Sequence, residues 1–212
     1  MPTFANLLEL AEASRQCQAC GLCKGRTQVV PGEGSDHAEI MFIGEGPGFH
    51  EDKQGRPFVG AAGQLLDEMI ALIGLKRQQV FITNAVKCRP PGNRDPLPEE
   101  IAACRPWLDQ QLEMLNPKLI VTLGRHAMGM FCPGESITRV HGSARRAENH
   151  LVMPMYHPAA ALYQQSLKKT LEADFLKIPD LLKALSKPAA PPALPPIPQQ
   201  KSEDKPQQLS MF

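Results

Sequence analysis

The chain has 212 residues, of which 42% are hydrophobic and 21% are charged, and its formal net charge is +1. These values are typical of a globular protein with room for one domain and a buried core. The near-neutral charge does not indicate a nucleic-acid-binding protein, but it does not exclude one, because local clusters of charge matter more than the sum.

The N-terminal segment has neither the basic start of a signal peptide nor an apolar run of membrane-spanning length. We therefore expect a cytoplasmic protein without a membrane partner. Thiols stay reduced in that compartment, so the six cysteines favour metal binding over disulfides.

Helices and strands are predicted to alternate along the body of the chain. After a short helix over residues 4–13, apolar runs of strand length predict buried strands at 38–46, 79–88, 117–124 and 150–158. Apolar periodicity predicts helices at 61–75, 97–115 and 170–185, and another from residue 125. This alternation favours a parallel sheet covered on both faces.

The most informative polar residues follow the predicted strands. They are Gly44 to Gly48, Asn84 to Arg89, and His157. Ligands of parallel sheets bind at the carboxyl ends of the strands, so we expect these segments to converge on one site.

The cysteines predict a metal site. Cys17 and Cys20 form a C-x2-C pair, while Cys88 and Cys104 are separated by fifteen residues. Four thiolates in this arrangement are able to enclose Zn or an iron–sulfur cluster, and spacing alone does not separate the two. Cys23 competes for a ligand role.

The glycine-rich segment "GEGPGFHED" (44–52) matches neither a dinucleotide fingerprint nor a Walker loop. It brings Glu45, Glu51 and Asp52 close together, which favours acid–base or electrostatic chemistry over phosphate binding. Phe58 lies in a second glycine-rich segment, where its ring is available to stack on a flat ligand.

Several long motifs together resemble those of a family 4 uracil-DNA glycosylase. They are "GEGPGFHEDKQGRPFVGAAGQLL", "TNAVKCRPPGNRDP" and "YHPAA", with the cysteines at 17, 20, 88 and 104, and the resemblance covers about residues 15–183. It implies an α/β fold, a three-layer α/β/α sandwich around a four-stranded parallel sheet. It also implies a [4Fe–4S] cluster on Cys17, Cys20, Cys88 and Cys104, with Cys23 as a bystander.

The resemblance implies an enzyme that flips uracil out of DNA and hydrolyses its N-glycosidic bond. Phe58 would stack on the base, Asn84 would read its edge, and His157 would hydrogen-bond its O2. The full set of implied uracil-binding residues is Glu45, Gly46, Gly48, Phe58, Asn84 and His157.

Glu45 and His157 are the implied catalytic residues. One departure concerns Gly46, which stands where other uracil glycosylase families place an aspartate that activates water. The usual general base is therefore missing from this chain.

Local charge predicts the DNA contacts. The substrate is expected to be single- or double-stranded DNA that contains uracil, bound by a monomer. The cations expected to contact phosphates are Lys87, Arg89, Arg94, Arg145 and Arg146. The residue that wedges into the gap left by the flipped base is expected to be Leu162, because Ala161 occupies the position where the family often has leucine.

The composition changes after the body of the chain. Residues 1–185 are predicted to form the glycosylase domain, and the Pro-rich residues 186–207 a disordered linker. The last five residues, "QLSMF" (208–212), resemble the bacterial sliding-clamp-binding peptide, with Gln208, Leu209, Met211 and Phe212 as its contact residues. Such a tether raises the local concentration of enzyme at replicating DNA, so we expect a cytoplasmic, nucleoid-associated protein.

A second function remains open from sequence, a non-catalytic iron–sulfur DNA-binding or replication-accessory module. The basic segments and the terminal peptide would serve it equally. The combination of Glu45, Phe58, Asn84 and His157 favours the enzyme, since a binding module needs no anion-stabilising histidine beside a base-reading amide.

Overall fold

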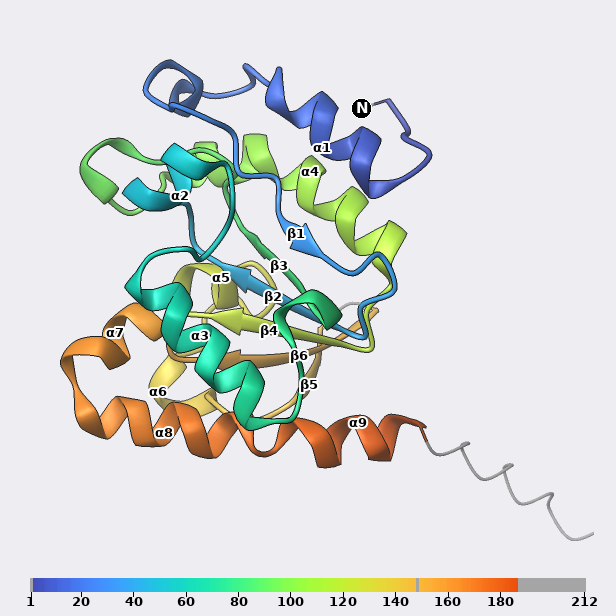
Figure 1. Cartoon of the computed structure of the whole chain (residues 1–212), viewed down its shortest axis with the longest axis vertical. Coiled ribbons are helices and arrows are strands. Elements are labelled where there is room, and N and C mark those ends of the chain that lie inside the picture. The colour runs from blue at the N-terminus through green and yellow to red at the C-terminus, as the bar shows by residue number, and fades with distance from the viewer. Residues whose placement is uncertain (1, 148, 187–212) are drawn as a thin grey trace, which may run out of the picture.

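A computed structural model describes residues 2–147 and 149–186. These residues form a six-stranded sheet with strand order β1-β3-β2-β4-β6-β5 (Figure 1). The strands are β1 (Glu33–Gly34), β2 (Ile40–Gly44), β3 (Phe81–Asn84), β4 (Leu119–Leu123), β5 (Arg145–Ala147) and β6 (His150–Met155). The four middle strands are parallel, as expected, and the two short edge strands pair antiparallel to their neighbours.

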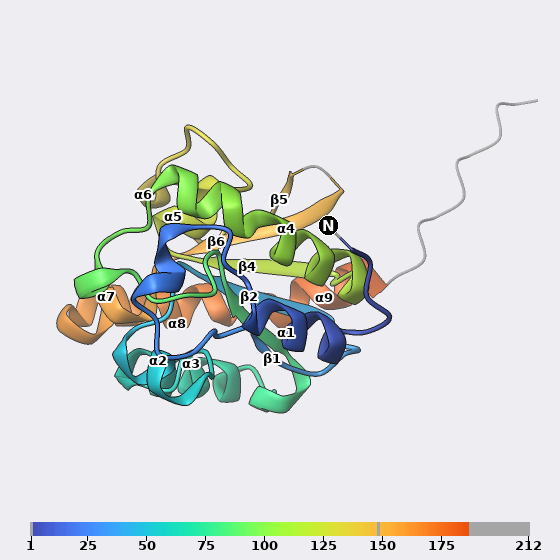
Figure 2. The ribbon, with the colours of Figure 1, turned by 90° about the horizontal axis from the view of Figure 1, so that it is seen from above.

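Helices cover both faces of the sheet (Figure 2). They are α1 (Leu7–Arg15), α2 (Phe49–Gln54), α3 (Ala61–Leu72), α4 (Pro98–Leu115), α5 (Arg125–Gly129), α6 (Ile137–Val140), α7 (Pro158–Tyr163), α8 (Gln165–Phe175) and α9 (Ile178–Ser186). Helices α3, α7, α8 and α9 pack on one face, and α4, α5 and α6 on the other. The expected α/β/α sandwich is confirmed.

Strand β2 shows why both faces need cover. Ile40 and Phe42 enter the core on the α3 side, while Met41 and Ile43 enter the core on the α4 side. All four side chains are almost completely buried. A strand buried on both faces is apolar at every position, which is the pattern that predicted it.

Two predicted elements differ in detail. The helix predicted over 170–185 is two helices, because α8 ends at Phe175 and α9 begins at Ile178. Pro179 lacks an N–H and fits only the first turn of a helix, so it marks the start of α9. The glycine-rich segment 44–52 runs into α2, whose N-cap residue is Gly48.

Among the described residues, no helix is both long and apolar enough to cross a membrane. Apart from Ser186, which ends α9, the predicted linker and terminal peptide lie outside the described residues.

Candidate functional site

A cavity of about 420 Å³ opens at the carboxyl ends of the parallel strands. Its walls come from the segment after β2, the end of β3 with the loop that follows, and the start of α7. The structure brings all six predicted base-binding residues to it: Glu45, Gly46, Gly48, Phe58, Asn84 and His157. The expectation that the segments after the parallel strands converge on one site therefore located this cavity.

Asn84 supplies a buried amide to this cavity. The residue is 1% exposed, and its Oδ1 atom has no hydrogen-bond partner among the described residues. A buried acceptor without a partner is costly unless a ligand completes it. Gly44 makes room for the amide, because a Cβ there would lie 2.4 Å from Asn84 Oδ1 and 2.6 Å from Phe58 Cζ.

His157 lines the same cavity from the end of β6, which is separated in the sheet from β3, the strand of Asn84, by β2 and β4. Its Nδ1 accepts the N–H of Ala159 at 3.1 Å, which leaves Nε2 to carry the proton of a neutral ring. The ring stacks on Phe58 with centroids 5.6 Å apart. Burial lowers the pKa of His157 to about 4, against the Glu51 carboxylate, which raises it. The imidazole is therefore a neutral N–H donor at pH 7.

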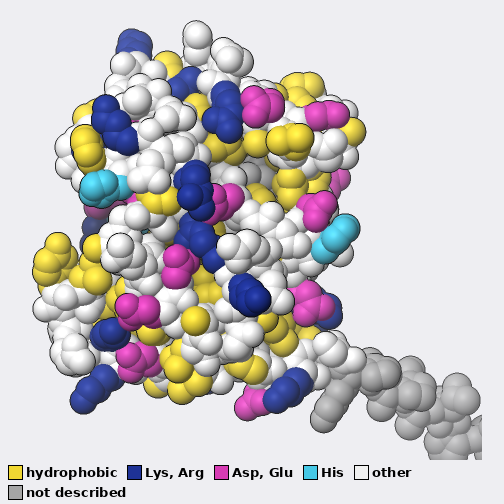
Figure 3. Space-filling view, viewed as in Figure 1, with side chains coloured by type: hydrophobic (Ala, Val, Ile, Leu, Met, Phe, Trp, Pro, Cys, Tyr) yellow, Lys and Arg dark blue, Asp and Glu magenta, His cyan; other side chains and the backbone are white. Residues whose placement is uncertain are grey.

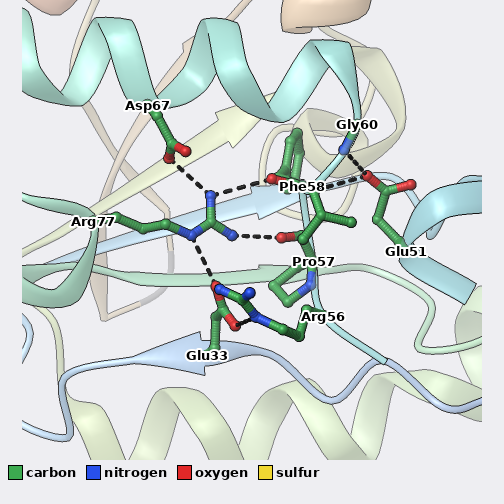
Figure 4. A network of polar contacts seen from close by, with 9 residues as sticks. Glu33, Glu51, Arg56, Pro57, Phe58, Gly60, Asp67 and Arg77 are labelled. Atoms are coloured by element: carbon green, nitrogen blue, oxygen red, sulfur yellow. Dashed lines mark hydrogen bonds and ion pairs between the residues drawn. The ribbon is translucent and has the colours of Figure 1, made fainter. Parts of the chain in front are cut away.

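Phe58 is held in an unusual backbone conformation, with φ at +49°. Residues other than glycine rarely adopt this region, so the surrounding contacts must impose it. Glu51 accepts the N–H groups of Val59 and Gly60 through Oε1, both at 2.9 Å (Figure 4). Gly63 lets α3 approach, since a Cβ there would lie 1.8 Å from the Phe58 carbonyl oxygen.

Arg77 holds the same loop from the other side (Figure 4). It donates to the carbonyl oxygens of Pro57 and Phe58, and it forms ion pairs with Glu33 and Asp67 at 2.8 Å each. One guanidinium therefore ties the Phe58 loop to β1 and α3. Sequence reasoning missed this residue, because no local pattern connects it with the loop.

Replacing Arg77 by methionine should lower the free energy of unfolding by about 2–4 kcal/mol, because Asp67 and two carbonyl groups lose their donor and Glu33 keeps only Arg56. The measurement is urea denaturation. Arg56→Met is the matched control: Arg56 pairs with the same Glu33, but its side chain is 56% exposed against 14% for Arg77. The control should cost less than about 1 kcal/mol. Equal losses would show that Arg77 has no special role.

The two other acids of the glycine-rich segment bind backbone N–H groups of neighbouring loops. Asp52 is buried and accepts the N–H groups of Thr27 and Gln28 through Oδ1. Glu51 binds the Phe58 loop as described. Both carboxylates are occupied by backbone groups, so of the three acids only Glu45 remains for chemistry.

Glu45 lies at the mouth of the cavity beside a pair that sequence reasoning missed. His126 Nε2 is 3.7 Å from the Glu45 carboxylate and 3.2 Å from that of Asp95, which also binds Arg125. Burial raises the pKa of Glu45, while His126 lowers it. The Arg125 guanidinium occupies Asp95, so these side chains form an ion-pair network. His126 lies three residues after β4 ends at Leu123, so a search for polar side chains just beyond the carboxyl ends of the strands would have found it.

A second, small cavity is lined by the N-terminal cysteines, Cys88 and Cys104. Three sulfur atoms face N–H donors at 3.3 Å: Cys17 faces Trp107 Nε1, Cys88 faces Arg26, and Cys104 faces the Lys87 amide. Such donors suit sulfur that carries negative charge, as metal-bound thiolate does. Cys23 also lines this cavity, and no N–H donor to its sulfur is found among the described residues.

The predicted phosphate-binding cations differ in position. Lys87 is 2% exposed, and its ammonium binds Thr83, the Asn84 carbonyl and Gln111, so its prediction as a DNA contact is wrong. Arg94 lines the cavity and pairs with Glu100.

The other predicted cations differ in their distance from the cavity. Arg89 directly precedes Pro90, which lines the cavity. Arg145 pairs with Val152 at the far half of β6, and β5 continues away from the cavity edge, so Arg145 and Arg146 do not lie at the site. On α7, Leu162 is exposed whereas Ala161 is buried, which suits the expected wedge.

Comparison with known proteins gives a consistent result. A model of the Uracil DNA glycosylase superfamily matches residues 31–179. The chain is 53% identical over 186 residues to a type-4 uracil-DNA glycosylase of Sulfurisphaera tokodaii, covering 83% of this chain and 84% of that protein. It is 44% identical over 189 residues to one of Thermotoga maritima, covering 86% and 98%. A type-5 uracil-DNA glycosylase of Pyrobaculum aerophilum is more distant, at 33% over 148 residues, or 61% of this chain and 65% of that protein.

Proposed function

Because this chain belongs to the uracil DNA glycosylase superfamily, and within it to the type-4 uracil-DNA glycosylases, we propose that it hydrolyses the bond between uracil and deoxyribose in DNA. The product is an abasic site for base-excision repair. The observation that carries this proposal is the buried Oδ1 of Asn84, which has no hydrogen-bond partner in the described part of the chain and lies in a cavity with the Phe58 ring and a neutral histidine.

Recognition begins when uracil leaves the base stack and enters the cavity. Phe58 stacks on the flat ring. Asn84 Oδ1 accepts the uracil N3–H, while its amide N–H donates to O4, so one side chain matches both groups. Cytosine presents the reverse pattern at these two positions, and the fixed amide therefore rejects it. The Lys87 ammonium donates to the main-chain carbonyl oxygen of Asn84 at 2.8 Å, which holds the backbone of this residue in place.

Cleavage breaks the bond between C1′ and N1, and uracil departs with the bonding electrons. His157 Nε2–H donates to uracil O2, where the negative charge of the leaving anion accumulates. The sugar meanwhile develops positive charge, as in glycoside hydrolysis generally. A neutral donor is suited to this task, because its proton stays in place and the backbone N–H of Ala159 fixes the orientation of the ring.

Glu45 supplies the negative charge that the sugar needs. Its carboxylate lies at the cavity mouth, held beside His126, and it stabilises the cationic sugar while water adds to C1′. The proton lost by water neutralises the departing uracil anion. Gly46 brings no side chain to the position of the usual general base, so electrostatic stabilisation replaces base catalysis here.

The test is excision itself. Purified protein is incubated with end-labelled oligonucleotides that carry one uracil or one thymine, followed by alkali to break abasic sites. Strand breaks only at uracil are expected. If the protein binds both oligonucleotides but cuts neither, the enzyme proposal fails.

The cysteine cavity is proposed to hold a [4Fe–4S] cluster through Cys17, Cys20, Cys88 and Cys104. The three N–H donors aimed at its sulfur atoms support this, as do the type-4 relatives. When bound, the cluster supplies iron–thiolate bonds that join the N-terminal segment to the loop after β3 and to α4. Its role in this proposal is to fix the segment that runs from Asn84 to Cys88.

Cys88→Ser and Cys104→Ser should each abolish iron binding, while Cys23→Ser should retain about four iron atoms and four sulfides per chain. The same is expected of Cys132→Ser, which changes a buried cysteine that does not line the cysteine cavity. Loss of the cluster should cost more than about 3 kcal/mol, which lowers the melting temperature by roughly 10 °C in a domain of this size. Iron and acid-labile sulfide analysis with thermal melting measures both. Iron loss in Cys23→Ser would overturn the ligand set.

We further propose that the protein acts on the nucleoid in the cytoplasm as a monomer. Arg89 and Arg94 would contact phosphates near the cavity, and Leu162 would fill the gap left by the flipped base. Gln208, Leu209, Met211 and Phe212 would bind the sliding clamp. Removal of residues 208–212 should abolish clamp binding in a gel-filtration assay without changing excision of a free oligonucleotide.

A further inference from the structure

Phe49 is an aromatic residue that the fold does not use for its core. It is the first residue of α2, it is 49% exposed, and it directly follows Gly48, which lines the base-binding cavity. Figure 3 shows hydrophobic, cationic and histidine side chains together over the α2 end of this edge of the molecule. A half-exposed phenylalanine beside a binding cavity offers a flat apolar face to a ligand.

Two cations flank this ring. The Arg89 guanidinium lies 5.2 Å from the ring centroid, and Lys53 Nζ lies 5.8 Å from it. Arg89 Nε donates to Asn93 Oδ1 at 2.7 Å, which fixes the guanidinium over the ring. No ion pair joins either cation to a carboxylate within residues 2–147 and 149–186. The positive charge is therefore available to an anion.

The loops that build this feature also build the cavity. The segment Glu45–Gly48 and Pro90 line the cavity. Phe49 directly follows that segment and Arg89 directly precedes Pro90, so both residues lie beside the cavity. A strand that places one base in the cavity must pass its neighbouring nucleotide over the adjacent rim. Nucleobases stack on exposed aromatic rings, and lysine or arginine beside the ring takes the phosphate.

We infer that Phe49, with Arg89 and Lys53, forms a stacking subsite for the nucleotide next to the flipped uracil in the same strand. Phe49 holds the neighbouring base by the exposed part of its ring, and the two cations beside that ring hold the phosphate of the same nucleotide. This inference rests on the proposed function and adds a subsite to it. The α7 side of the cavity, with the exposed Leu162, would receive the strand on the opposite rim.

The experiment uses single-stranded oligonucleotides with one uracil, in which the 5′ or the 3′ neighbour is either a normal nucleotide or a tetrahydrofuran spacer without a base. Single-turnover rates are measured over a range of enzyme concentrations. With the wild-type protein, removing the base at one of the two positions should weaken apparent binding about 5- to 100-fold, while the rate at saturation changes little.

Phe49→Ala should bind the complete oligonucleotide more weakly than wild type by the same factor. On the spacer oligonucleotide, its apparent affinity should equal that of wild type. Phe49→Trp should bind at least as tightly as wild type, and Arg89→Gln should reduce the dependence of binding on salt. Leu8→Ala is the control, since Leu8 is 71% exposed on α1 and does not line the cavity.

The outcomes separate the two proposals. Equal binding of all spacer oligonucleotides by wild type would overturn the subsite and leave excision intact, and this measurement does not depend on the folding of any variant. Unchanged binding by Phe49→Ala would overturn it as well. Absence of uracil excision by wild type would instead remove the proposed function.

Discussion

Replacing His157 by alanine is expected to lower the rate of uracil excision at saturation roughly 10²- to 10³-fold. The variant loses the N–H that meets the uracil O2 as negative charge develops, and one such donor typically contributes this factor. KM should change little, because the donor acts mainly on the transition state. His150→Ala is the matched control, as His150 begins β6 at the end far from the cavity.

The pH dependence gives a second readout. His157 has a pKa of about 4 instead of 6.5, chiefly because burial penalises the charged ring. It therefore stays neutral between pH 5 and 8. The unfolded chain takes up this proton at higher pH than the folded one does, so the stability contribution is complete above pH 6.5 and is lost as pH falls toward 4. NMR of the ring nitrogens should find the neutral Nε2–H form at pH 7; titration near 6.5 would contradict the assigned role.

Replacing Asn84 by alanine should lower kcat/KM for uracil by roughly 10²- to 10³-fold. The uracil N3–H and O4 groups would then enter a cavity that no longer offers them partners, and unpaired buried polar groups are costly. Asn84→Asp should be equally impaired, because the carboxylate has no N–H for O4. The control is Asn149→Ala, which changes an exposed residue of the β5–β6 turn.

Binding separates this role from a structural one. Both Asn84 variants should bind abasic product DNA with nearly wild-type affinity, since phosphate contacts carry most of that affinity and the missing base needs no amide. Parallel loss of product binding and excision would show that Asn84 merely supports the fold. Thermal melting of both variants completes the comparison, because the Lys87 ammonium binds the main chain of residue 84, which survives the substitution.

The cavity could be located from the sequence because strands buried on both faces are apolar at every position. Ile40 to Ile43 are apolar at every position, so the strand and its carboxyl end were readable. The same rule placed Asn84 and His157 correctly. The edge strands were not readable, because β1 has only two residues and β5 only three, too few to show alternation.

Tertiary partners account for the errors. Lys87 looked like a surface cation beside Arg89, but Thr83 and Gln111 provide oxygens that satisfy its ammonium inside the protein. Those partners lie on β3 and α4, and no local pattern connects them. Glu51 belongs to the acidic segment that suggested acid–base or electrostatic chemistry, whereas the loop eight residues later supplies the N–H groups that its carboxylate binds.

The way the Phe58 loop is held bears on how this protein can evolve. Glu51 and Arg77 contact only main-chain atoms of residues 57–60, so neither recognises the side chain at position 58. These contacts fix the backbone of the loop whichever ring stands at position 58. A single substitution at position 58 could exchange one ring for another of similar size while the backbone of the loop keeps its conformation. The range of bases that the cavity accepts can therefore change by one substitution, provided that the new ring fits the space that Gly44 leaves open.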